Sequence, residues 1–377
     1  MRKVYFPGLN GVRFIAALLV IIDHTELFKS NFGYGTLWED PYSSFLGASG
    51  VTIFFVLSGF LITFLLISEK QEGGVHIKNF YIRRILRIWP LYYLVLLVGF
   101  FIVPHLGFLD VPNYTTDMQE YGTRFILFFT LFANVAYVYL PTVAYSNILW
   151  SVAVEEQFYL FWPHIVKHSR KLLYVMLAFI VLFVALRLAL MVTLPQSRIN
   201  ALVERTRFTS MVIGALGAYV VVHKHNVLNF IYDRSVQGVT ILTFILLLAD
   251  VIHSKYTDLF LWEILSVVVC CLIVNIATND RSFIKLETNW LNYLGKLSYG
   301  LYVYHLFAVV ITLKVIPVVF NIGSLNGPLG YSLTMISILG LTTIMSHISY
   351  TYFEGLFLRK KMSYSSIISG DLVKRAT

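Results

Sequence analysis

Long apolar blocks recur from one end of the chain to the other, and they constrain its fold more than any other feature. Of the 377 residues, 58% are hydrophobic and only 13% are charged, whereas about a quarter of the residues in a soluble domain are charged. The mean hydropathy is +0.73. Apolar blocks of about twenty residues predict membrane-spanning helices, so we expect an all-α, polytopic transmembrane bundle.

The placement of the basic residues predicts the topology of this bundle. Lys and Arg gather in short segments such as 70–87, 167–171 and 359–361, whereas the segment 105–123 contains none. The apolar segment 124–140 either crosses the membrane or is re-entrant or interfacial, and the charge bias favours the alternative without a crossing, with both termini in the cytoplasm. The ten predicted spans are residues 9–28, 45–67, 88–104, 148–166, 172–194, 207–223, 236–253, 258–277, 297–319 and 329–353.

The same placement argues against a nucleic-acid partner, although the net charge is +9. The basic residues lie between apolar blocks, where they serve topology.

Cys270 and Cys271 are adjacent within an apolar run and lack the spacing of metal ligands, so no metal is expected. We expect one membrane domain, residues 1–361, and a cytoplasmic tail, residues 362–377. The sequence does not specify an oligomeric state, and a homo-oligomer stays open.

The first span carries Arg13 and His24 in the stretch GLNGVRFIAALLVIIDHTE. Eleven residues at about 100° each place both side chains on one helix face, roughly 16 Å apart along the axis. Ionisable groups inside a membrane are functional candidates, but a histidine near a helix end can also reach the interface. Asp23 points about 100° away from its neighbour, so a partner that orients His24 must come from another span.

Three arginines precede the third span in the stretch NFYIRRILRIWPLYY. Arg83, Arg84 and Arg87 fall within two helical turns, and the last two share a face. Forked guanidinium groups suit phosphate binding. The alternative is a purely topological anchor that keeps this loop in the cytoplasm.

Two carboxylates, Glu155 and Glu156, interrupt the span ILWSVAVEEQFYLFWP. Ser151, Glu155 and Tyr159 share one helix face, and a buried carboxylate requires a partner or a proton. At least one glutamate therefore faces the bundle interior, either as the partner of an arginine or as the orienter of a catalytic base.

Three further polar residues lie within or beside predicted spans. His305 is either part of a functional interior or an ordinary structural hydrogen-bonding residue. Arg187 and Arg207 could pair with the glutamates or contact an acidic substrate.

Five stretches in this order together resemble the integral-membrane acyltransferase family 3, whose members acetylate bacterial surface polysaccharides. They are GLNGVRFIAALLVIIDH with its Arg-x10-His spacing, FFVLSGFLI, RRILRIWPLYY with its Arg-x-x-Arg spacing, WSVAVEEQFYLFWP and LSYGLYVYH.

This resemblance implies a multi-pass protein of the bacterial cytoplasmic membrane with acetyl-CoA, or another acyl-CoA, as co-substrate. The implied acceptor is a hydroxyl of a polysaccharide, O-antigen or lipid-linked oligosaccharide. His24 would be the catalytic base, supported by Glu155 or Glu156, and His305 would complete the polar interior. The donor phosphates would meet the arginines, namely Arg13, Arg83, Arg84 and Arg87.

General-base catalysis and a covalent acyl-histidine are both compatible with these residues. Two other classes of function stay open: a transporter or flippase for a small anion or a lipid-linked saccharide, and a non-catalytic partner of a polysaccharide synthase.

Overall fold

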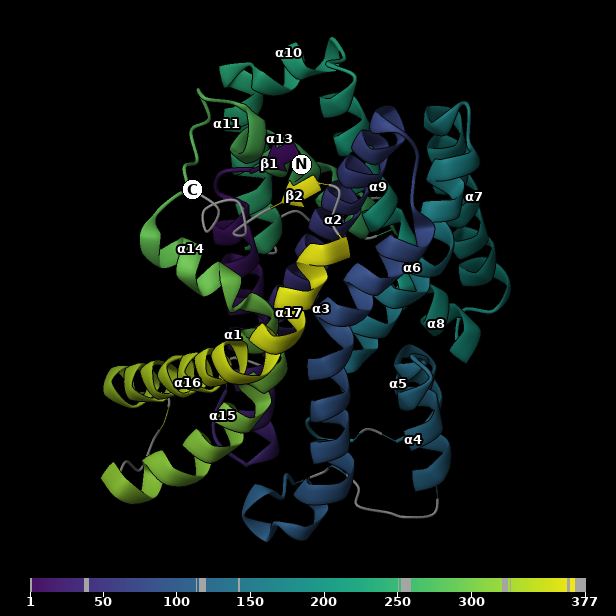
Figure 1. The fold of residues 1–377 in the computed structure, drawn as a ribbon. Helices are drawn as coiled ribbons and strands as arrows, with labels where there is room; N and C mark the ends of the chain where they lie inside the picture. The colour runs from purple at the N-terminus through teal and green to yellow at the C-terminus, as the bar shows by residue number, and fades with distance from the viewer. Residues whose placement is uncertain are drawn as a thin grey trace.

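The computed structural model describes residues 2–36, 41–112, 114, 120–141, 143–249, 251, 259–320, 325, 327–364 and 367–369. Helices make up almost all of this structure (Figure 1), which confirms the predicted all-α class. Two three-residue strands, β1 (Arg2–Val4) and β2 (Ile367–Ser369), pair in parallel where the two ends of the chain meet.

The longer helices are α1 (Leu9–Asn31), α2 (Pro41–Glu72), α3 (Ile77–Leu97), α6 (Leu149–His168), α7 (Leu172–Thr193), α9 (Phe208–Val222), α11 (Arg234–Leu248), α13 (Leu261–Thr278), α15 (Ser298–Phe320) and α16 (Pro328–Ile348). The shorter helices are α4 (Tyr121–Phe129), α5 (Ala133–Tyr139), α8 (Arg198–Thr206), α10 (Val227–Tyr232), α14 (Asn289–Lys296) and α17 (Gly355–Lys361). A π-helical turn, Ser349–Glu354, joins α16 to α17, and a single 3-10 turn, Met362–Tyr364, follows α17.

Six helical segments in the described part of the chain are long and apolar enough to cross a membrane, and the chain is an integral membrane protein. These segments contain α2, α3, α7, α13, α15 and α16. With 23 and 20 residues, α1 and α6 reach about 30 Å or more at 1.5 Å per residue. They carry the ionisable residues singled out in the sequence. The count of ten spans and the orientation of the termini stay predictions.

The ambiguous segment 124–140 is not one continuous helix. It forms parts of α4 and α5, which have nine and seven residues and reach only about 14 Å and 11 Å, less than the roughly 30 Å of a membrane core. The helical path is interrupted at Leu131, whose φ is 63°. Gln157 of α6 donates to the Leu131 carbonyl (2.9 Å) and to Asn134 Oδ1 (2.8 Å), so α6 anchors the break.

Close backbone contacts hold α2 between α1 and α9 (Figure 1). A Cβ atom at Gly59 of α2 would overlap the Met211 carbonyl oxygen, and one at Gly214 of α9 would overlap the Val56 carbonyl oxygen. Small residues allow this approach, which favours helix association in lipid. On the other side of α2, a Cβ at Gly50 would lie 2.5 Å from the Ala16 carbonyl oxygen of α1. Gly50 thus allows the close approach of α1, the helix that carries Arg13 and His24, to α2.

We predict that Gly59→Ala destabilises the protein, because the added methyl group must push α2 away from α9. Overpacking of this kind costs about 1–3 kcal/mol. Gly340→Ala in α16 is the matched control, since nothing lies within 4 Å of its Cβ position. The apparent melting temperature in detergent should fall for Gly59→Ala only. An equal melting temperature for wild type and Gly59→Ala would contradict the tight crossing.

Candidate active site

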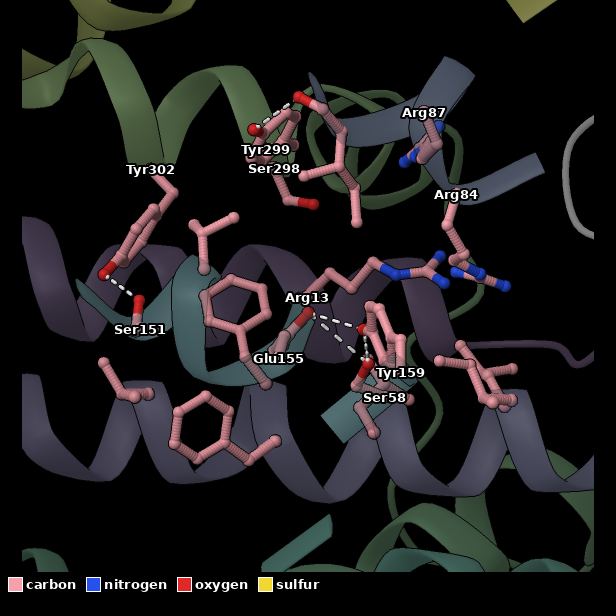
Figure 2. Close-up of a pocket in the computed structure, with 18 residues that line it drawn as sticks. Arg13, Ser58, Arg84, Arg87, Ser151, Glu155, Tyr159, Ser298, Tyr299 and Tyr302 are labelled. Carbon is pink, nitrogen blue, oxygen red and sulfur yellow. Dashed lines mark hydrogen bonds between the residues drawn. The ribbon is translucent and has the colours of Figure 1, made fainter. Parts of the chain in front are cut away.

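A polar passage runs into the bundle between α1, α2, α3, α6, α15 and α17. One part, the chamber, has a volume of about 150 Å³, and the adjoining part, the mouth, has a volume of about 300 Å³. The two parts share Arg13, Leu61, Arg84 and Arg87 in their walls. Figure 2 shows the chamber with these arginines at one end and Tyr302 at the other.

Five basic side chains line the mouth, and none of the described residues in its wall is Asp or Glu. The structure brings together Arg13, Arg84 and Arg87, three of the four arginines that the sequence assigned to the donor. The other two cations, Arg359 and Lys361, come from α17. The sequence alone predicts only topological charges at these two positions, because nothing in their spacing shows that α17 folds back to α3. A cluster of this kind is suited to bind phosphates.

Arg83 does not share this location. Its guanidinium donates to Glu69 (2.6 Å) and to the Tyr364 carbonyl oxygen (2.9 Å), and it is buried. Adjacent residues on a helix point about 100° apart, so Arg83 faces α2 while Arg84 faces the passage. The structure places Arg83 in an ion pair that ties α3 to the C-terminal segment.

The two glutamates face different surroundings. Glu155 lines the chamber and accepts a hydrogen bond from Tyr159 (2.7 Å), which is also bonded to Ser58. The predicted face of Ser151, Glu155 and Tyr159 does line the chamber. By contrast, Glu156 accepts a hydrogen bond from Trp89 Nε1 (2.8 Å).

Neither glutamate orients His24, which corrects that expectation. His24 is held instead by His305 of α15, with His24 Nδ1 and His305 Nε2 2.7 Å apart and the two rings parallel within 4°. The partner therefore comes from another span, as predicted. Asp23, the neighbour of His24, instead packs against Gly47 of α2.

The hydrogen bonds of this pair fix both neutral tautomers. His305 Nδ1 lies 2.6 Å from the Tyr302 carbonyl oxygen, which can only accept, so this nitrogen carries the hydrogen. His305 Nε2 then holds a lone pair and accepts from His24 Nδ1–H. The remaining nitrogen, His24 Nε2, consequently has a lone pair, and it belongs to a half-buried ring whose partner is fully buried.

Tyr302 contacts both the chamber and the histidine pair. Its ring lines the end of the chamber, and its hydroxyl bonds to Ser151 Oγ (2.7 Å) and the Ile148 carbonyl oxygen (3.0 Å), as Figure 2 shows for Ser151. Its own carbonyl binds His305. Neither histidine lines the chamber, but the His305 ring centroid lies 6.0 Å from that of Tyr302, so the pair is close to this end of the chamber.

Arg187 and Arg207 lie in a different part of the bundle. Arg187 donates to Glu263 Oε2 (3.0 Å) and to the Leu259 carbonyl oxygen (2.7 Å). The guanidinium of Arg207 stacks 3.4 Å from the Trp262 ring centroid. Arg187 thus pairs with a glutamate of α13 and not with Glu155 or Glu156, and neither arginine lines the passage.

The chain was compared with known families and proteins. Residues 6–347 match a family model described as an acyltransferase domain. A Bacillus subtilis protein named "Putative peptidoglycan O-acetyltransferase YrhL" is 26% identical over 93% of this chain and 54% of its own length. Peptidoglycan O-acetyltransferase OatA of Listeria monocytogenes is 32% identical over 43% of this chain and 24% of its own. The chain spans about half of the first relative, and no solved structure matches it.

We predict that Arg187 stabilises the fold and does not bind substrate. Arg187→Met leaves Glu263 without its ion-pair partner in a mostly buried position, which should cost about 3 kcal/mol. The double variant Arg187→Met, Glu263→Met should recover most of this loss, because an apolar pair replaces the ionic one. Thermal unfolding of the three proteins checks this expectation. A single variant as stable as the wild type would contradict it.

Proposed function

This chain belongs to the acyltransferase family, and on that premise we propose that it moves an acetyl group from acetyl-CoA to a hydroxyl of a cell-envelope saccharide. The supporting observation is the passage itself, which leads from five basic side chains in the mouth to Tyr302, whose carbonyl oxygen bonds to His305 of the histidine pair. Both relatives carry the name O-acetyltransferase. Family membership favours this function over a transporter or flippase.

The donor enters through the mouth, which faces the cytoplasm in the predicted topology. Its diphosphate binds at Arg13, Arg84 and Arg87, because guanidinium groups form forked, charge-assisted hydrogen bonds with phosphate oxygens. The pantetheine arm then extends into the chamber. Its amide groups meet polar side chains there, including Ser58 and Glu155, among otherwise apolar walls. The thioester reaches the end that Tyr302 closes.

The Tyr302 side chain must turn aside before the thioester can meet His24. The geometry allows this movement without disturbing the histidines, because His305 bonds to the backbone carbonyl of Tyr302 and not to its hydroxyl. The hydrogen bonds to Ser151 and Ile148 hold the closed position.

His24 Nε2 acts as the general base in this proposal. It removes the proton from the acceptor hydroxyl while the oxygen attacks the thioester carbonyl, and the new C–O bond forms as the C–S bond breaks. The imidazolium then returns the proton to the leaving thiolate. His305 accepts from His24 Nδ1 throughout, so it keeps the reactive nitrogen oriented and stabilises the transient positive charge. Acetyl transfer through His24 itself would use the same nitrogen.

The acceptor is a saccharide on the opposite side of the membrane from the donor. Because the relatives are named peptidoglycan O-acetyltransferases, peptidoglycan is the first acceptor to test. Other envelope polysaccharides, O-antigen and lipid-linked oligosaccharides belong to the same chemical class of hydroxyl acceptors.

We predict that His24→Ala lowers acetyl transfer by about 10²–10⁴-fold, the usual contribution of a general base. Binding of acetyl-CoA should stay unchanged, since His24 does not line the chamber or the mouth. His347→Ala is the matched control, because that histidine is exposed and bonds to Tyr293. The measurement is radiolabelled acetyl transfer to envelope glycan in membrane vesicles. Full activity of His24→Ala would refute the assignment.

We also predict that Arg84→Gln raises the KM for acetyl-CoA about ten-fold, the effect of about 1.4 kcal/mol. The KM for S-acetyl-N-acetylcysteamine, which has no phosphate, should not change. Lys78→Gln removes the same charge from an exposed position on α3 outside the passage and serves as control. Equal effects of Arg84→Gln on both donors would show that Arg84 does not bind phosphate.

A further inference from the structure

We propose that α17 forms a separate phosphate subsite, in which Arg359 and Lys361 bind the 3′-phosphate of the donor's adenosine. This subsite would let the protein discriminate CoA thioesters from thioesters that lack this phosphate. The inference rests on the proposed function, because it takes acyl-CoA as the donor.

The order of the cations along the passage carries the inference. Arg13, Arg84 and Arg87 line both the chamber and the mouth, whereas Arg359 and Lys361 line only the mouth. The α17 cations therefore lie outside the chamber, whose walls include Tyr302. Acyl-CoA has the same order of parts: from the thioester outward, the pantetheine arm is followed by the diphosphate and then by the adenosine with its 3′-phosphate.

Placing the thioester at Tyr302 consequently puts the diphosphate near the shared arginines and the 3′-phosphate near α17. The mouth has about twice the volume of the chamber, and its walls include Tyr5, Phe6 and Tyr350, against which an adenine ring can stack.

The structure also shows what holds α17 at this position. The Arg83 guanidinium bonds to the Tyr364 carbonyl oxygen just after α17 and to the Glu69 carboxylate of α2. On the other side of α17, the π-helical turn Ser349–Glu354 contributes Tyr350 and Thr351 to the wall of the mouth. Such turns often occur at functional sites. Arg83 is thus a positioning residue for the subsite, which explains why it lies outside the passage.

If the basic residues of α17 served only to orient the helix in the membrane, removal of any one of these charges would have the same effect on donor binding. The helix contains an internal comparison, because Lys360 is exposed and does not line the mouth, whereas Arg359 and Lys361 do. Lys360→Gln removes the same charge from the same helix and is the matched control.

The experiment measures binding of acetyl-CoA and of 3′-dephospho-acetyl-CoA to the purified full chain in nanodiscs by titration calorimetry. The wild type should bind acetyl-CoA about ten-fold more tightly. Lys361→Gln and the double variant Arg359→Gln, Lys361→Gln should bind acetyl-CoA as weakly as the wild type binds the dephospho donor, with little change for the dephospho donor. Lys360→Gln should keep the full discrimination.

Equal binding of both donors by the wild type, or full discrimination by the double variant, would overturn the subsite. Arg359→Gln alone tests the same idea at an exposed position, where the change leaves folding intact. If the wild type bound neither donor, the proposed function would be wrong, because it takes acyl-CoA as the donor. Equally tight binding of both donors would contradict only the subsite.

Discussion

An ionisable side chain inside a membrane requires a partner or a polar cavity, and this constraint organises the whole bundle. Some of these groups form buried pairs: Lys29 pairs with Glu26 within α1, whereas Arg83 with Glu69 joins α3 to α2 and Arg187 with Glu263 joins α7 to α13. Others line the passage, where Glu155 and three arginines meet. A charged residue in a buried pair stabilises the fold, whereas one in the wall of the passage is available to a ligand.

The histidine pair depends on the packing of α1 and α15 around it. Glycines on α2 let α1 approach closely, and α15 follows α14 without a long loop, so His24 and His305 meet although 281 residues separate them. Their hydrogen bonds leave one nitrogen lone pair on the half-buried ring. This lone pair suits the ring to accept a proton, which is the role that the proposed function gives to His24.

Much of this arrangement could be predicted from the sequence, because helix periodicity places side chains on faces. The all-α class, the shared face of Ser151, Glu155 and Tyr159, and a partner for His24 from another span all follow from local spacing. The identity of that partner does not, since it depends on how α1 and α15 pack. For the same reason the sequence does not show that Arg83 and Arg84 have different partners, or that Lys361 lines the mouth. Both facts depend on the path that the chain takes after α16.

The central claim is that one passage joins the cationic mouth to His24. A structure of the protein bound to a non-hydrolysable acetyl-CoA analogue, determined in nanodiscs, tests this claim most directly. The account predicts phosphates against Arg13, Arg84 and Arg87, a displaced Tyr302 side chain, and the carbonyl carbon of the analogue next to His24 Nε2. An analogue bound outside this passage, or an acyl group that ends far from His24 while Tyr302 stays bonded to Ser151, would contradict it.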